Sequence, residues 1–381
     1  MVRSLSRHQQ LERNSLMGDI SHLLKPRILE GKPYNPTAPL RMLYKERSDF
    51  ARLMGNELPF GISPQARQAI IDELDNAHLY PDSSYYDLKQ ALSKYTGFPD
   101  THIVVGNGST HFIDAFYYGF LNPGDAVLFI PPDYGPYRIR LDFFGGISQL
   151  APRAPPDYAW TIDHVFDAIK PETKELIIIS PNNPVGNCIP EKAMRQLLDL
   201  DLLVVLDEAY FEFADTTLTN LVHEYSNLIV TRTMAKAFGF AGLRLGYALT
   251  NPTLTDYLTK VIHHFPVNRL TAVGAIAALE DTAYLDYVKH EIQKGREYLE
   301  KALAALPEVR TFPSKTNFVL TQFTNSDVKS DEVTQHLLQQ GIIVRDYTGK
   351  AGLEGQFIRI TVGTQQQNET CVNAIKAALE A

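Results

Sequence analysis

Cysteine and tryptophan are scarce in this sequence: its 381 residues include two cysteines, Cys188 and Cys371, and one tryptophan. The two cysteines are far apart and lack the close spacing of metal ligands, so neither a disulfide framework nor a zinc site is expected. No apolar run is long enough to cross a bilayer, and residues 1–26 lack the apolar core of a secretion signal. We therefore expect a soluble, cytoplasmic protein.

An excess of basic residues is also lacking. Lysine and arginine number 36 against 44 aspartates and glutamates, a formal net charge of −8. Because nucleic acids and anionic membranes are bound by basic faces, neither is expected as a partner. An anionic small molecule would have to be held locally. The chain is long enough for one large domain and a smaller one.

Short apolar runs predict the core of the large domain. They occupy residues 102–106, 126–130, 175–180, 202–207 and 228–233. Helix-period segments separate them, and they show no polar alternation. This pattern is typical of an α/β fold whose mostly parallel sheet is covered by helices on both faces.

From about residue 270 the pattern changes to long helices, followed by strand patterns at 316–323, 342–347 and 356–363 and a C-terminal helix. This predicts a smaller α+β domain. We expect an N-terminal arm at 1–50, a large domain at 51–268 and a small C-terminal domain at 269–381.

Unusual residues follow the predicted strands, where parallel sheets bind ligands. The turn "GNGST" at 106–110 opens a helix, so its N–H groups could bind a phosphate; a tight turn with a helix cap at Ser109 or Thr110 is the alternative. Asp207 ends a buried run and needs a partner, for which a cationic heterocycle would serve. Tyr210 could reach the same ligand.

Two other loops are open to two interpretations. Asn183 lies between prolines in "SPNNPVGN", either in a simple turn or in a rigid loop that directs an amide at a ligand. Tyr134, in "PPDYGPY", either packs within its loop or stacks on a flat ring.

Lys236 stands alone among apolar residues in "TMAKAFGFAGLRLGY". It is either a surface lysine at the start of a helix or a desolvated amine whose pKa is lowered by burial, by Arg244 and by the positive end of an adjacent helix. Such an amine can attack an aldehyde. Together with the strand-end residues it describes a ligand with a ring nitrogen, a phenolic oxygen, a phosphate and an aldehyde, which is pyridoxal 5′-phosphate.

The motifs "NELPFGISP", "YPD", "GNGS", "SPNNPVGN", "DEAYFEF", "AKAFGFAGLRLGY", "GIIVRD" and "IRITVGT" follow one another in this order. With them the chain, from about Gly31 to its end, resembles the class I/II aminotransferases of pyridoxal-phosphate fold type I. Within that family it is most similar to the histidinol-phosphate aminotransferases. The resemblance implies a large domain with a seven-stranded sheet and a smaller C-terminal domain.

The resemblance also implies roles at the cofactor. Lys236 would attach the cofactor and later move the proton, Asp207 would pair with the ring nitrogen, and Tyr134 would stack on the ring. Asn183 and Tyr210 would bond the phenolic oxygen. The phosphate would be held by Gly108, Ser109, Thr110, Thr233 and Arg244, and by Tyr80 of the neighbouring subunit of a homodimer.

For the substrate, the resemblance implies that Arg359 binds the α-carboxylate and that Asn56 and Asn183 help to cover it. Arg345 would lie near a distal, phosphorylated group, or else form an ion pair with Asp346 or another acid. The chain departs from the family at Ala235, where Ser is frequent, and at Arg269, an unexpected charge near a substrate wall.

Three functions remain open at the level of sequence. The leading one is transamination of an amino acid or a phosphorylated amine, with 2-oxoglutarate as the acceptor. The same cofactor could instead support elimination, cyclisation or decarboxylation of a modified amino acid. A non-catalytic protein that has kept the fold is the third, and the complete set of cofactor residues speaks against it.

Overall fold

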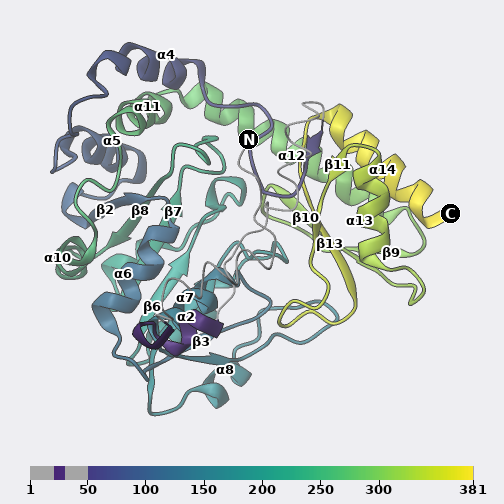
Figure 1. Ribbon diagram of the computed structural model, residues 1–381, viewed down its shortest axis with the longest axis horizontal. Helices are drawn as coiled ribbons and strands as arrows, with labels where there is room; N and C mark the ends of the chain where they lie inside the picture. The colour runs from purple at the N-terminus through teal and green to yellow at the C-terminus, as the bar shows by residue number, and fades with distance from the viewer. Residues whose placement is uncertain (1–20, 31–49, 381) are drawn as a thin grey trace, which may run out of the picture.

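A computed structural model describes residues 21–30 and 50–380. The rest of the predicted N-terminal arm, residues 1–20 and 31–49, and Ala381 lie outside the described residues. Two bodies lie side by side, one built on a large sheet and the other on a small sheet near the C-terminus (Figure 1).

The large sheet has seven strands in the order β2-β8-β7-β6-β5-β3-β4. β8 pairs antiparallel with β2 and β7, whereas the other neighbours are parallel. The predicted mostly parallel sheet is therefore confirmed, and so are its five predicted strands. The strands are β2 (Ile103–Asn107), β3 (Ala126–Phe129), β4 (Ile147–Leu150), β5 (Thr173–Ile179), β6 (Leu203–Asp207), β7 (Leu228–Thr233) and β8 (Leu245–Thr250).

Helices bury both faces of this sheet, which explains the unbroken apolar runs. Val204 and Leu206 of β6 belong to one core cluster, and Val205 between them belongs to another. Because successive strand residues point to opposite faces, each face needs its own apolar cover. The helices of this body are α4 (Pro64–Asp72), α5 (Tyr86–Thr96), α6 (Thr110–Phe120), α7 (Pro136–Phe144), α8 (Asp163–Ala168), α9 (Glu191–Leu198) and α10 (Pro252–Val261).

Short 3-10 helices lie in the connections between the elements of the large body. They are η3 (Leu74–Asn76), η4 (Asp100–His102), η5 (Phe211–Phe213) and η6 (Thr219–His223).

The small body is an antiparallel sheet in the order β12-β13-β10-β9, covered by helices. Its elements are β9 (Val309–Thr311), β10 (Phe318–Phe323), α13 (Ser330–Gln339), β12 (Arg345–Asp346), β13 (Gln356–Thr361) and α14 (Gln365–Glu380). A separate parallel pair joins β1 (Ala51–Arg52) to β11 (Ile342–Ile343), so the chain entering the large body is tied to the small one.

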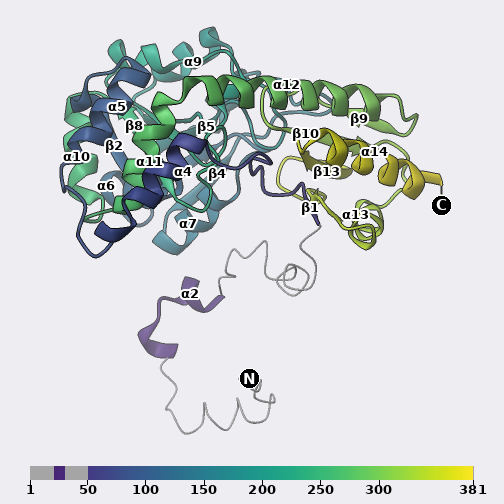
Figure 2. The ribbon, with the colours of Figure 1, turned by 90° about the horizontal axis from the view of Figure 1, so that it is seen from above.

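Two consecutive helices join the bodies. α11 (Arg269–Glu280) packs against α4 and α5 of the large body. α12 (Thr282–Ala304) then runs along the top of the molecule toward the small sheet (Figure 2). The domain boundary expected at 268/269 stays a prediction.

The described piece of the N-terminal arm holds η1 (Ser21–Leu23) and α2 (Pro26–Glu30). It is anchored to the large body by Arg27, whose Nη1 donates to Asp142 Oδ1 at 3.1 Å and to the carbonyl oxygen of Gly146 at 3.3 Å.

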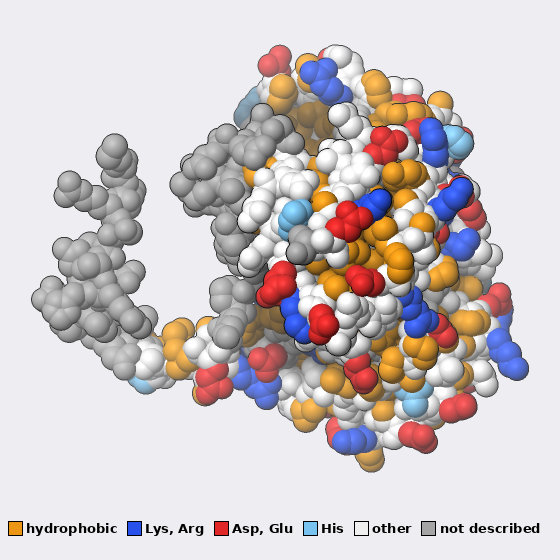
Figure 3. All heavy atoms as spheres, turned by 90° about the vertical axis from the view of Figure 1, so that its right-hand side faces the viewer, with side chains coloured by type: hydrophobic (Ala, Val, Ile, Leu, Met, Phe, Trp, Pro, Cys, Tyr) orange, Lys and Arg blue, Asp and Glu red, His pale blue; other side chains and the backbone are white. Residues whose placement is uncertain are grey.

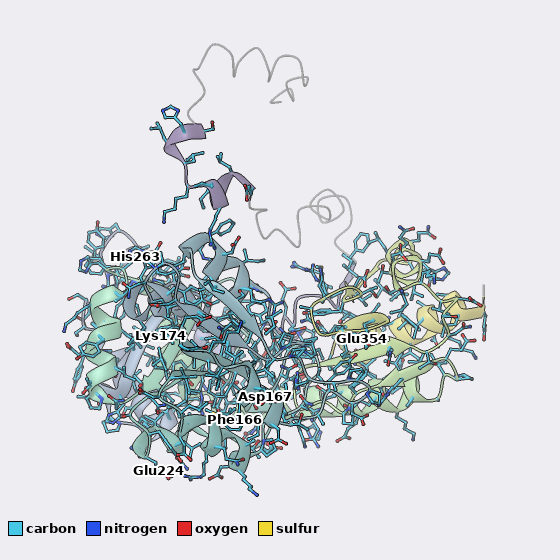
Figure 4. The ribbon with its side chains drawn as sticks, turned by 90° about the horizontal axis from the view of Figure 1, so that it is seen from below. Phe166, Asp167, Lys174, Glu224, His263 and Glu354 are labelled. Carbon is cyan, nitrogen blue, oxygen red and sulfur yellow. The ribbon has the colours of Figure 1, made fainter. Side chains whose placement is uncertain are left out.

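Acidic and basic side chains are interspersed on the face that carries the small sheet (Figure 3). Figure 4 shows Glu354 on this body and Phe166, Asp167 and Glu224 on the larger one. Within residues 21–30 and 50–380, no helix combines the length and the hydropathy that crossing a bilayer requires.

Glu175 of β5 is a buried acid without a hydrogen-bond partner among the described residues, and burial raises the pKa of its carboxyl to about 8. At pH values between 4.5, the ordinary pKa, and about 8, the Glu175 carboxyl keeps its proton in the folded protein but has lost it in the unfolded chain. The free energy of unfolding therefore falls as pH rises through this window. We predict that Glu175→Gln leaves stability nearly unchanged at about pH 4.5 and increases it at about pH 8, measured by urea unfolding.

The exposed Glu280 supplies the matched control, since Glu280→Gln should shift the unfolding midpoint equally little at both pH values. A Glu175→Gln effect of the same size at the two pH values would contradict the assignment of a protonated, buried Glu175.

Candidate active site

A pocket opens at the carboxyl ends of the strands of the large sheet, and β12 and β13 of the small body complete its wall. It brings together twelve of the residues that the sequence pointed to: Asn56, Ser109, Thr110, Tyr134, Asn183, Asp207, Tyr210, Thr233, Lys236, Arg244, Arg345 and Arg359. The others are Arg52, Met54, Gly55, Glu57, Ile179, Ala209, Ala235 and Tyr347.

Lys236 lies in a series of turns that follows β7, not at the start of a helix, so the surface-lysine interpretation is wrong. Its Nζ donates to the carbonyl oxygen of Gly55 at 3.3 Å. Burial lowers the pKa of this amine from 10.5 to about 8, and Arg359 is the next largest cause of the lowering. Arg244 lowers it less, whereas Glu57 and Asp207 raise it. Desolvation is thus the main reason why the pKa of this amine lies close to neutral pH.

Asp207 ends β6 and is 6% exposed. Burial raises the pKa of its carboxyl to about 6. Hydrogen bonds from Tyr137 and the N–H of Ala209 act in the opposite direction and limit this increase. The Tyr137 hydroxyl donates to Oδ2 at 3.0 Å, and the Ala209 N–H donates to Oδ1 at 3.0 Å. These two donors fix the carboxylate so that it faces the pocket.

The hydroxyl of Tyr210 accepts from Asn56 Nδ2 at 2.8 Å and, more weakly, from Asn183 Nδ2 at 3.4 Å. The orientation of the Asn183 amide is fixed, because its Oδ1 accepts from Arg359 Nη1 at 2.7 Å. With both amides donating to its oxygen, the Tyr210 hydroxyl keeps its own hydrogen for a ligand.

The turn before α6 has the form of an anion cradle. Among the described residues, the N–H groups of Ser109 and Thr110 have no partner. Arg244 Nη2 donates to Thr110 Oγ1 at 3.1 Å. A Cβ on Gly108 would lie 2.3 Å from Arg244 Nη2, and one on Gly246 would lie 2.2 Å from the Ser109 nitrogen. Two glycines thus allow a cation and a strand to close around two free N–H groups at a helix N-terminus.

Arg359 and Arg345 enter the pocket from opposite positions on paired strands, because their Cα atoms are register partners in β13 and β12. Arg359 is 5% exposed; its Nη1 also donates to the Tyr347 hydroxyl at 2.7 Å, and its Nη2 donates to the Met54 carbonyl at 2.7 Å. Its Nε has no partner among the described residues. Among the described residues, Arg345 forms no ion pair with Asp346 or another acid. Asp346 instead accepts hydrogen bonds from Ser330 and Thr348.

Three predicted or suspected residues are not among those that line the pocket: Gly108, which adjoins it next to Ser109, and Tyr80 and Arg269. Tyr80 is 79% exposed and its ring stacks on Phe265 at a centroid distance of 4.8 Å. Arg269 forms an ion pair with Glu73, and its Nη1 donates to the carbonyl oxygen of Tyr80 at 3.4 Å. Arg269 therefore does not line the pocket of its own subunit: it connects α11 with the chain beyond α4 and supports the loop that carries Tyr80. Its position near a substrate wall stays a prediction.

Three further residues of the site were not predicted from the sequence. Tyr137 fixes Asp207, and Tyr347 donates from its hydroxyl to Asn183 Oδ1 at 3.2 Å. The third is the buried Arg153, whose Nη2 donates to the carbonyl oxygen of Pro132 at 3.0 Å and whose Nη1 donates to Asn187 Oδ1 at 2.9 Å. Arg153 thereby joins the loop of Tyr134 to the loop of Asn183. The second tyrosine of "PPDYGPY" was the one available signal.

The donor set fits pyridoxal phosphate group by group. The amine of Lys236 suits the aldehyde of the cofactor, and the buried carboxylate of Asp207 suits its ring nitrogen. The Tyr210 hydroxyl, which has a hydrogen to donate, suits its phenolic oxygen. The two unpartnered N–H groups beside Arg244 suit its phosphate.

Known proteins agree with this arrangement. The family model "Aminotransferase class I and II" matches residues 48–375. Histidinol-phosphate aminotransferase of Methanosarcina mazei is 36% identical over 93% of this chain and 96% of its own, and that of Roseiflexus castenholzii is 35% identical over 94% and 98%. The crystal structure of histidinol-phosphate aminotransferase from Sinorhizobium meliloti in complex with pyridoxal-5′-phosphate superposes with a TM-score of 0.86 at 27% identity, over 96% of this chain and 99% of that one.

The bond between Tyr137 and Asp207 can be tested without cofactor. We predict that Tyr137→Phe lowers the free energy of unfolding by about 1 kcal/mol at neutral pH, because one hydrogen bond to a buried carboxylate is lost. It should also raise the pKa of Asp207, since the Tyr137 bond lowers it.

The measurement is urea unfolding of the cofactor-free protein. Tyr118→Phe is the matched control, because Tyr118 is 68% exposed. Equal stabilities for the two variants would show that the Tyr137 hydroxyl does not hold Asp207.

Proposed function

The chain belongs to the class I and II aminotransferase family, and from this premise we propose that its amino donor is histidinol phosphate and its amino acceptor is 2-oxoglutarate. It is a pyridoxal-phosphate-dependent transferase. The choice of donor is supported by the names of relatives about one third identical over most of the chain.

One observation carries the proposal for this donor: Arg345 and Arg359 are directly opposite on neighbouring antiparallel strands, and both line the pocket. Side chains at opposed positions share a face, and like charges there repel. A doubly charged phosphate ester relieves the repulsion better than a single carboxylate does. Histidinol phosphate has no carboxylate on its amino carbon, so we assign its phosphate to both arginines, with the unpartnered Nε of Arg359 as one donor.

We assign the remaining pocket residues to the cofactor, which when bound supplies an aldehyde and a ring that withdraws electrons from the amino carbon. Ser109, Thr110 and Arg244 hold its phosphate, with Gly108 and Thr233 shaping that end of the pocket. Tyr134 covers one face of the ring. Asp207 keeps a proton on the ring nitrogen, and Tyr210 and Asn183 bind the phenolic oxygen.

Lys236 is the catalytic base of the proposal. Its lowered pKa leaves a substantial fraction of neutral amine near pH 8. The neutral Nζ can remove the proton from the substrate's amino carbon and deliver it to the cofactor's aldehyde-derived carbon, two atoms away. We assign Asn56, which lines the same pocket and donates to Tyr210, to help cover the substrate.

The alternative outcomes, elimination, cyclisation or decarboxylation, are not favoured by the curated relatives, which are named as aminotransferases. A cytoplasmic homodimer is part of the proposal. The exposed ring of Tyr80 stacks on the exposed Phe265, and Leu74, Leu79 and Tyr86, near it in sequence, are exposed too, as expected of a surface that a second subunit covers. From there we propose that Tyr80 reaches the cofactor phosphate of the neighbouring subunit.

The role of Arg345 is tested with a pair of donors that differ only in the phosphate. We predict that Arg345→Ala lowers kcat/KM for histidinol phosphate about 30-fold, the value of a charged hydrogen bond of about 2 kcal/mol. The value for unphosphorylated histidinol, low in the wild type, should change little. Lys350→Ala, which removes an exposed charge from the following loop, is the control.

An equal loss with both donors would contradict the assignment of the phosphate to Arg345. Failure of the wild type to convert histidinol phosphate, with conversion of another amine, would contradict the proposed donor.

The role of Tyr80 is tested by mixing subunits. Tyr80→Ala and Lys236→Ala homodimers should each be nearly inactive. Because a twofold dimer of one subunit of each kind has one site with both native residues, unfolding and refolding the two together should restore about a quarter of wild-type activity. No recovery in the mixture, with dimers formed, would mean that Tyr80 does not act across the interface.

A further inference from the structure

The pocket contains an ion pair that the cofactor and the substrate phosphate leave unused. Glu57 and Asp207 are the acids among the described residues that line it, and Asp207 belongs to the floor at the end of β6. Glu57 pairs with another residue of the pocket wall, Arg52, whose Nη2 donates to its Oε1 at 2.9 Å. Arg52 ends β1, and Glu57 lies in the segment that leads from β1 to the large body.

This pair lies close to the reacting amine. Gly55, between the two charged residues in sequence, accepts from Lys236 Nζ at 3.3 Å. Glu57 is also the acid with the largest effect on the Lys236 amine, ahead of Asp207. In a bound substrate, the amino carbon lies at Lys236 and the anionic group lies on Arg345 and Arg359. The remaining substituent of the amino carbon must therefore contact another part of the pocket wall.

The two substrates of the proposed reaction place different groups there. The donor carries an imidazole, which presents an N–H and, when protonated, a positive charge. The acceptor is a 2-oxo diacid, whose second carboxylate is negative. A single pocket that takes both in turn needs a hydrogen-bond acceptor for one and a cationic donor for the other.

We propose that Arg52 and Glu57 form a reversible subsite for this third substituent, in which Glu57 accepts the imidazole N–H of the donor and Arg52 binds the distal carboxylate of the acceptor. The proposal rests on the proposed function and adds the residues that distinguish its two substrates. In each half of the reaction, the ligand replaces one partner of the ion pair.

The exposure of the pair makes such an exchange feasible. The side chain of Arg52 is 49% exposed and that of Glu57 is 38% exposed. Ion pairs in this environment contribute little to stability, so a ligand can displace one partner at little cost. The buried pair of Arg232 and Glu208, 4% and 3% exposed, could not exchange in this way.

The experiment measures the two half-reactions separately in the purified holoenzyme, by the change in cofactor absorbance on rapid mixing. One series titrates histidinol phosphate into the aldehyde form, and the other titrates 2-oxoglutarate into the amine form. Each gives a half-saturating concentration and a limiting rate. The proteins are the wild type, Glu57→Ala and Arg52→Ala, with O-phosphoethanolamine as a donor that has the phosphate but no imidazole.

We expect a crossed pattern. Glu57→Ala should raise the half-saturating concentration of histidinol phosphate about tenfold or more and leave those of 2-oxoglutarate and O-phosphoethanolamine unraised. Arg52→Ala should raise that of 2-oxoglutarate by a similar factor and leave that of histidinol phosphate unraised. For Arg52→Ala the limiting rates should change much less than the half-saturating concentrations, since Arg52 does not touch the reacting atoms. Glu57→Ala also removes the acid that most raises the pKa of Lys236, so its half-saturating concentrations are the readout that decides.

Equal effects of both variants on both substrates, as expected of a pair that only shapes the loop, would overturn the subsite, and so would no effect at all. A wild type that converts 2-oxoglutarate but not histidinol phosphate would instead refute the proposed donor, and the Glu57 assignment with it. In that case the response of 2-oxoglutarate to Arg52→Ala still decides the Arg52 half.

Discussion

The active site depends on the lowered pKa of the Lys236 amine, which lies in the pocket beside a second cation. Burial accounts for most of the lowering of its pKa, and Arg359 adds to it from the small body. The acids Glu57 and Asp207 act in the opposite direction. A lysine left in water would be almost fully protonated at neutral pH and could be neither nucleophile nor base. The fold of the large sheet, which gathers loops at one edge, and the position of the small body both serve this condition.

The same contacts connect the place of the cofactor with that of the substrate. Arg359 and Tyr347 belong to the small body, and both bond to Asn183, on a loop of the large sheet. Asn183 in turn donates to Tyr210, whose hydroxyl faces the proposed phenolic oxygen. An anion that engages Arg359 therefore acts on the groups that hold the cofactor, and on the pKa of Lys236. Arg153 stiffens this arrangement from behind, since it fixes the loops of both Tyr134 and Asn183.

Much of this could be predicted from the sequence, because the relevant signals are local. The apolar runs gave the five strands, and Asp207, Asn183 and Lys236 follow such runs directly, so they had to meet at one edge of a parallel sheet. β4 was missed because its edge position leaves Ile147 and Leu150 exposed, and β8 because its first half, residues 245–247, lies within the lysine motif. The contacts of Tyr137, Tyr347 and Arg153 join residues that are distant in sequence. No sequence motif or spacing predicts such contacts.

The most direct test of this account is the pKa of Lys236 in cofactor-free protein, measured by NMR after reductive methylation with ¹³C-formaldehyde and assigned by its absence in Lys236→Ala. The account predicts a pKa of about 8 and an increase in Arg359→Met, because that variant removes the cation with the largest effect. A resonance that titrates near the ordinary 10.5 in the wild type, unmoved by Arg359→Met, would contradict it.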